Sequence, residues 1–147
     1  MGCTATLIAP DTILTAAHCT INPFEQFGLQ FEYFFTFELD VSSFDSDPSQ
    51  LPPGSVKIAQ MVPHPDFRFE GQSGMMMSGL SNYFDIGLGY LSEEITQVTP
   101  AVIMQSDDSS FIVQGASVEI TGYGQTSVSA QSAGIKYHGD SIINEVA

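Results

Sequence analysis

The stretch that decides the fold is CTATLIAPDTILTAAHC, residues 3–19. Small, apolar and β-branched residues fill 3–9 and 12–17, and the turn pair Pro10-Asp11 separates the two runs. This pattern predicts two strands joined as a hairpin. The second strand runs directly into His18 and Cys19, which places a histidine at the end of an apolar strand.

Further strands are predicted on the C-terminal side of this hairpin. Over 29–41 every odd position is apolar and most even positions are polar, with Phe34 breaking the polar face, so we expect one long strand with a wet face. Polar or glycine-rich loops are expected at 42–55 and 63–83. Shorter strands are predicted at 56–62, 86–91 and 116–123. Many short strands without a long helix or a repeat predict an all-β barrel or sandwich.

Length and charge limit the classes of function. The chain has 147 residues, enough for one domain with a hydrophobic core, and 43% of them are hydrophobic. No apolar run reaches the length of a membrane span. The net charge is −14, which repels nucleic-acid phosphates. We therefore expect no nucleic-acid partner and no membrane partner.

The chain contains two cysteines, Cys3 and Cys19. Two cysteines are too few for a disulfide-built miniprotein and fit no common zinc pattern. A disulfide between them would close a separation of 16 residues in the sequence and contribute about 3 kcal/mol. Such a bond would place the protein in an oxidising compartment. No signal peptide is visible, and strand-like sequence follows Met1 almost at once.

Two residues are candidates for chemistry. His18 follows an apolar strand, where a positioned imidazole is the usual general base, whereas an isolated histidine is more often structural. Asp85 stands at the head of the apolar run 86–91. A carboxylate there can orient a histidine, although a lone aspartate at this place is more often a cap of the strand.

Residues 3–19, taken together, closely resemble the histidine segment of the trypsin/chymotrypsin family of serine proteases (peptidase S1). The resemblance implies that His18 is the catalytic base and that Cys3 and Cys19 form a disulfide. Asp85-Ile-Gly-Leu resembles the family's aspartate segment, which gives Asp85 the orienting role. Gly87 stands where the family usually has alanine, and Gly89 is unusual because glycine weakens strands.

Three later segments follow the family's order. Val62–Phe67 resembles the segment between base and aspartate, in which His64 would be structural. Gly122-Tyr123-Gly124 resembles the opening of the second barrel, and 135–146 resembles the strand pair after it. The resemblance implies an all-β, trypsin-like double β-barrel. Its first barrel (about 1–100) would be nearly complete, and the connector with the start of a truncated second barrel would occupy about 101–147.

The family's nucleophile segment, Gly-Asp-Ser-Gly-Gly, does not occur in this sequence. Gly139-Asp140-Ser141 matches three letters, but Ile142 and Ile143 follow, and the match comes too early after Gly122. We expect Ser141 to be an ordinary turn residue. The segments that lock the active form and line the specificity pocket are also missing, so we expect a fragment.

Two other patterns suggest different sites. Residues 1–6 match a myristoylation signal, with Cys3 as a palmitoyl site, but a lipid anchor needs a free, flexible terminus. The three histidines, His18, His64 and His138, lie at no short metal-ligand spacing, and a loop is the better interpretation of Met75–Met77. We expect no metal and no cofactor.

The resemblance implies a secreted (extracellular or periplasmic) serine endopeptidase that cleaves polypeptides. His18 and Asp85 would be present and the nucleophilic serine would lie outside this chain. This fragment should be inactive, because removing the nucleophile of such a triad costs about 10⁶-fold in turnover. The main rival is a non-catalytic, protease-like binding or regulatory module; a third interpretation is a lipid-anchored adaptor. Cleavage specificity, activation and oligomeric state are not specified by the sequence.

Overall fold

The computed structural model describes residues 2–21, 28, 31–43, 50–69, 82–105, 110–126 and 133–144. These residues form short β-strands and short 3-10 turns, with no α-helix among them. The elements are β1 (Thr6–Ala9), β2 (Thr12–Thr15), η1 (Ala17–Cys19), β3 (Phe34–Phe35), β4 (Val56–Pro63), β5 (Arg68–Phe69), β6 (Asn82–Tyr83), β7 (Gly87–Leu91), β8 (Ser117–Gly122) and β9 (Tyr137–Ile142). The predicted all-β class is confirmed.

The chain divides into two compact units. The first, here called the sheet unit, consists of Ala5–Phe37 and Pro52–Ala101. The second, here called the hairpin unit, consists of Met1–Thr4, Glu38–Leu51 and Val102–Ala147.

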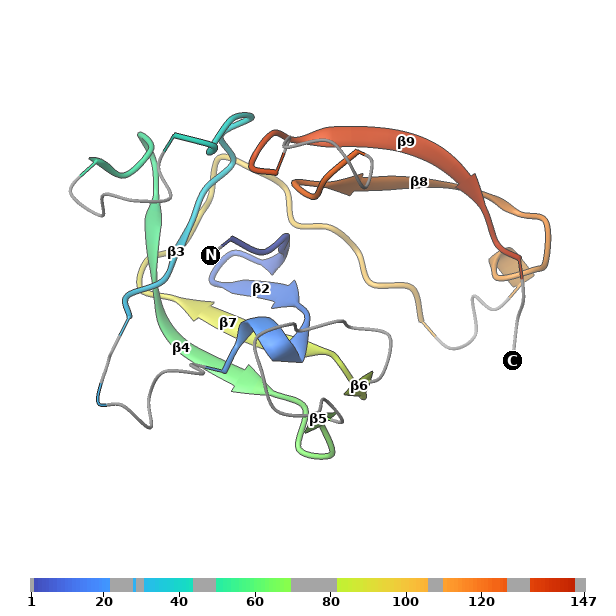
Figure 1. Ribbon diagram of the computed structural model, residues 1–147, viewed down its shortest axis with the longest axis horizontal. Coiled ribbons are helices and arrows are strands. Elements are labelled where there is room, and N and C mark those ends of the chain that lie inside the picture. Colours follow the sequence, from blue (N-terminus) through green and yellow to red (C-terminus); the bar gives the residue numbers. More distant parts are fainter. Residues whose placement is uncertain are drawn as a thin grey trace. The chain divides into compact units, whose positions relative to one another are not determined.

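The sheet unit is built on five antiparallel strands in the order β1-β2-β7-β4-β3, which curl into half of a barrel (Figure 1). The predicted hairpin is present, with Leu7 paired to Ile13 across β1 and β2. Strand β7, far along the chain, pairs with both β2 and β4 and so lies in the middle of the sheet. The predicted strands at 56–62 and 86–91 correspond to β4 and β7.

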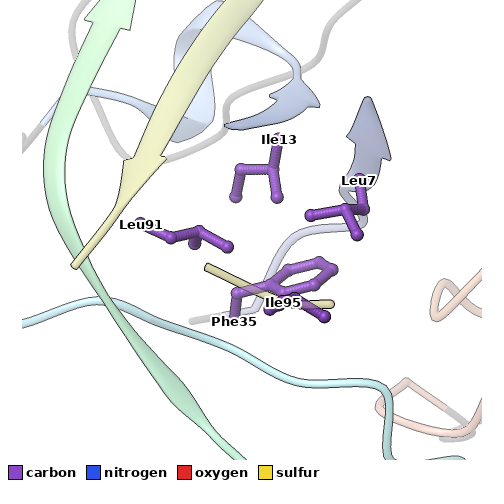
Figure 2. Close-up of a cluster of buried hydrophobic side chains, with 5 residues drawn as sticks. All are labelled: Leu7, Ile13, Phe35, Leu91 and Ile95. Carbon is purple, nitrogen blue, oxygen red and sulfur yellow. The ribbon is translucent and has the colours of Figure 1, made fainter. Parts of the chain in front are cut away.

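The core of the sheet unit lies on the concave face of these strands. Side chains alternate between the two faces of a strand, so each strand sends only part of its apolar residues inward. Figure 2 shows the buried cluster, which consists of Leu7, Ile13, Phe35, Leu91 and Ile95. Burial of each of these side chains contributes about 1.5–3 kcal/mol to the stability of the sheet unit.

The prediction of one long strand over 29–41 is wrong for the described residues 31–41. Only Phe34–Phe35 pairs as a strand, against β4, and Asp40 makes an isolated bridge to Ile135. The chain passes from the sheet unit to the hairpin unit after Phe37, so no single sheet accepts the whole run. Periodicity alone could not reveal this division.

The two predicted loops differ in outcome. The described residues of 42–55 contain no strand, as expected. The loop predicted at 63–83 instead has β5 and β6 near its two ends, paired to each other as a short ribbon. Met75–Met77 lie outside the described residues.

The hairpin unit contains β8 and β9, paired over six positions from Ser117↔Ile142 to Gly122↔Tyr137. The predicted strand at 116–123 is therefore present, and the segment after Ile135 contributes one strand within its described part. Tyr123 donates its hydroxyl to the Glu38 carbonyl at 2.7 Å. Burial raises the pKa of this phenol above its ordinary value, and the Glu38 carboxylate raises the pKa further.

No helix long and apolar enough to cross a membrane occurs among the described residues.

Two glycines of β7 are required by close packing. Gly89 lies opposite the fully buried Ile13, and a Cβ at this position would come within 2.9 Å of Ile13 Cγ1 and 3.3 Å of Ile58 Cγ2. A Cβ at Gly87 would lie 2.6 Å from Thr20 Cγ2 and 3.2 Å from both the Ala17 Cα and the Val62 carbonyl oxygen. Glycine weakens strands in general, but here its missing side chain lets neighbouring residues fill the space.

We expect Gly89→Ala to lower the free energy of unfolding by about 1–3 kcal/mol, because the added methyl group overpacks the core around Ile13. Urea unfolding monitored by circular dichroism measures this change. Gly139→Ala is the matched control, since a Cβ in that strand position meets nothing within 4 Å. Equal stabilities of the two variants would contradict the packing argument.

Gly87→Ala should also destabilise the sheet unit by about 1–3 kcal/mol, although alanine and glycine are both small. The added Cβ would meet the methyl group of Thr20. The Thr20 hydroxyl donates to the Ala17 carbonyl at 2.8 Å, and a serine at position 20 can keep this bond without the methyl group. Thr20→Ser should therefore recover part of the loss when combined with Gly87→Ala. A double-mutant cycle measures the coupling, and strictly additive effects would show that the two side chains do not compete for space.

Candidate functional site

His18 lies at the centre of the 3-10 turn η1, three residues after Thr15, the last residue of β2. The turn is closed by two backbone hydrogen bonds, from the Cys19 N–H to the Ala16 carbonyl (3.0 Å) and from the Thr20 N–H to the Ala17 carbonyl (2.9 Å). Ala17 is completely buried. The imidazole therefore projects from a backbone that is fixed on both sides.

Asp85 reaches the same place from a distant part of the sequence. It stands two residues before β7, and the β2–β7 register pairs Thr15 with Gly87. Because the two strands are antiparallel, the end of β2 and the start of β7 meet at one edge of the sheet. The pairing thus joins residues that are 67 positions apart in the chain.

The Asp85 carboxylate uses both oxygens on one residue. Oδ1 accepts the backbone N–H of His18 at 2.8 Å, and Oδ2 lies 2.7 Å from the ring atom Nδ1. The side chains of His18 and Asp85 are 24% and 17% exposed, so the pair is sheltered without being closed off from solvent. The meeting of these two side chains, on which the sequence interpretation depended, is present.

This geometry assigns the proton on the imidazole. An ionised carboxylate only accepts hydrogen bonds, so Nδ1 carries the hydrogen that points to Oδ2. The neutral ring then has its lone pair on Nε2. A histidine held in this tautomer can take a proton at Nε2, and the adjacent carboxylate stabilises the imidazolium that forms.

The two cysteines are disulfide-bonded, as the family resemblance implied. Cys19 is the last residue of η1, so the crosslink is attached directly beside His18. Because both sulfurs are oxidised, neither is a thiolate ligand for a metal. The bond also occupies the sulfur that palmitoylation of Cys3 would need, which argues against the lipid-anchored adaptor.

The residue before Asp85 has an unusual backbone. Phe84 has φ 54°, the left-handed region, and no other non-glycine residue in the described part of the chain has a positive φ. For a bulky residue this conformation costs about 1–3 kcal/mol. The Phe84 ring stacks on the His64 ring, with centroids 4.9 Å apart and planes 10° from parallel. Such a stack contributes about 0.5–1.5 kcal/mol.

Sequence reasoning did not find the role of Phe84 or Thr20. Glycine and asparagine are the usual signals for a left-handed position, and phenylalanine gives none. His64 was expected to be structural. Its ring lies against Phe84, and its Nδ1 accepts the Asp66 N–H at 3.1 Å.

The remaining candidates lie in the hairpin unit. Ser141 is a half-buried strand residue of β9, paired with Val118, so the expected turn at this position is wrong. Its place in regular pairing follows from Ile142, which continues the strand where a nucleophile loop would have glycine. His138 is exposed, with Nδ1 3.6 Å from a carboxylate oxygen of Glu119.

Comparison with known proteins places the chain in a family. A search of curated proteins finds no match. The family model described as Trypsin matches residues 1–139 of the 147, a span that includes the histidine turn, the aspartate and most of the hairpin unit. With the curled antiparallel sheet and the His18–Asp85 pair, this match shows that the chain belongs to the trypsin family of serine proteases.

Proposed function

We propose that this chain supplies the general base and the orienting carboxylate of a secreted serine endopeptidase, with His18 and Asp85 in these roles. The observation that carries the proposal is the double contact of Asp85 with the backbone N–H and the ring Nδ1 of His18. A carboxylate that only capped the strand β7 would need neither bond. The disulfide beside His18 is in keeping with an oxidising compartment.

The reaction would use a serine that this chain does not provide. His18 would accept the serine hydroxyl proton at Nε2 while the serine oxygen attacks the peptide carbonyl carbon. The imidazolium, stabilised by Asp85, would then return the proton to the leaving amine, which breaks the C–N bond. Water would hydrolyse the acyl-enzyme by the same route, with His18 again as base.

The proposal includes the domain division and the source of the serine. Residues of about 1–100 would form the first barrel, and those of about 101–147 the connector and the start of the second. The serine would lie on sequence beyond this chain, and the substrate would be a polypeptide. The reading frame of the parent gene tests this directly: a Gly-Asp-Ser-Gly-Gly segment downstream supports the enzyme, and a stop codon directly after Ala147 supports a non-catalytic module.

A second prediction concerns the 147-residue chain itself. We expect no hydrolysis of peptide substrates and no covalent labelling by a fluorophosphonate probe, because such probes react only with an activated serine. Intact-mass spectrometry measures the labelling, and an active serine protease treated in parallel is the control. A mass increase that maps to Ser141 would overturn the assignment of the serine to sequence outside this chain.

Asp85→Asn should lower kcat by about 10⁴-fold in the parent enzyme, a magnitude established for this kind of triad. The amide can donate a hydrogen bond to Nδ1, which moves the ring proton to Nε2 and removes the base. Steady-state kinetics on a peptide substrate measures the loss. Asp140→Asn removes the same charge from an exposed strand position and should leave kcat nearly unchanged. Similar rates for the two variants would contradict the orienting role.

A further inference from the structure

The direction of the Asp85 side chain depends on the turn that delivers it. The Ile86 N–H donates to the Phe84 carbonyl at 2.7 Å, so the chain folds tightly with Asp85 at the centre. The left-handed φ of Phe84 sets the orientation of the next peptide unit, and hence of the Asp85 carboxylate. That carboxylate must meet two atoms of His18, the backbone N–H and Nδ1, at hydrogen-bonding distance.

Burial does not hold Phe84 in this conformation, because 57% of the residue is exposed. Its described aromatic contact is the stack on His64. The His64 ring is itself fixed by neighbouring backbone groups. The backbone N–H of His64 donates to the Ile86 carbonyl at 2.9 Å, and the ring atom Nδ1 accepts the Asp66 N–H. The backbone of His64 is therefore held beside Ile86, directly after Asp85, and its ring offers a flat surface to Phe84, directly before Asp85.

We infer that His64 and Phe84 are positioning residues, which together aim the Asp85 carboxylate at His18. This inference rests on the proposed function, since it assigns the two residues to the same site. The stack stabilises a backbone conformation that phenylalanine otherwise avoids. Without the stack, Phe84 relaxes towards negative φ, the following peptide rotates, and the carboxylate loses at least one of its two contacts with His18.

The first test is His64→Ala in the 147-residue chain. NMR of nitrogen-15-labelled protein observes the His18 Nδ1–H proton and its exchange with solvent, and Asp85→Asn identifies this signal by abolishing it. Loss of the stack should make the exchange about 2- to 12-fold faster. This range is the free energy that an aromatic pair usually contributes, expressed as a ratio of exchange rates. An unchanged exchange rate would overturn the inference.

The decisive variant is the double mutant His64→Ala/Phe84→Gly. Glycine adopts positive φ without strain, so it should hold the turn without the stack and return the exchange rate towards that of the unmodified chain. A residue that served only general packing would behave in the opposite way, because the double mutant removes more contact area than the single one. If the His18 Nδ1–H proton exchanged as fast in the double mutant as in His64→Ala, the proposal would be wrong.

Two further single variants separate the effect of the ring stack from those of the Nδ1 hydrogen bond and of the strain at Phe84, and they provide a test if His64→Ala fails to fold. His64→Phe keeps a flat ring for stacking but loses the Nδ1 acceptor, and it should retain most of the protection of the His18 proton. Phe84→Leu keeps an apolar side chain but has no ring, and it should lose protection, whereas Phe84→Gly alone should retain it. If Phe84→Leu were protected as well as Phe84→Gly, the strain argument would be wrong.

The NMR signal reports the His18–Asp85 pair whether or not a peptide is ever cleaved. In the parent enzyme, His64→Ala should lower kcat with little change in KM, and Phe84→Gly should restore kcat. A fall in proton protection without a fall in kcat would leave the positioning role intact and refute the catalytic role of the pair. No change in either quantity would refute the positioning role alone.

Discussion

The antiparallel pairing of β2 with β7 is the constraint on which the site depends. Its register, with Thr15 opposite Gly87, brings together a turn that leaves one strand and a residue that enters the other. A slip of one residue would turn every side chain of the strand to the opposite face, so the same register also fixes which residues reach the core. Ile13 and Leu91 are buried by the pairing that joins His18 to Asp85.

The glycines of β7 show how tightly this register is held. At Gly89 the neighbouring side chain of Ile13 fills the space above the strand, and at Gly87 the methyl group of Thr20 does so. The family usually has alanine at the position of Gly87. In this chain the methyl group of Thr20, on the turn that carries the histidine, lies where a Cβ of residue 87 would be, so the strand and the turn fit together through Gly87 and Thr20.

The sequence was most informative where chemistry and local structure coincide. The hairpin, the cysteine pair and the two site residues were predicted because turn residues, β-branched residues and a specific histidine segment all lie within 3–19 or at Asp85. The long strand over 29–41 failed for a tertiary reason, since the chain changes unit after Phe37. The conformation of Phe84 had no local signal, because phenylalanine is not a residue type that favours positive φ and its stacking partner, His64, lies in a distant part of the sequence.

The hairpin unit leaves many apolar side chains on its surface. The most exposed are Val102 at 94%, Phe111 at 68%, Leu39 at 67% and Ile120 at 60%. Apolar surface of this kind favours contact between molecules, and the net charge of −14 opposes it. Salt screens that repulsion beyond about 8–10 Å at 0.1–0.15 M ionic strength. Purification of this chain should therefore succeed best in dilute neutral buffer, with high-salt steps and acidification both promoting precipitation.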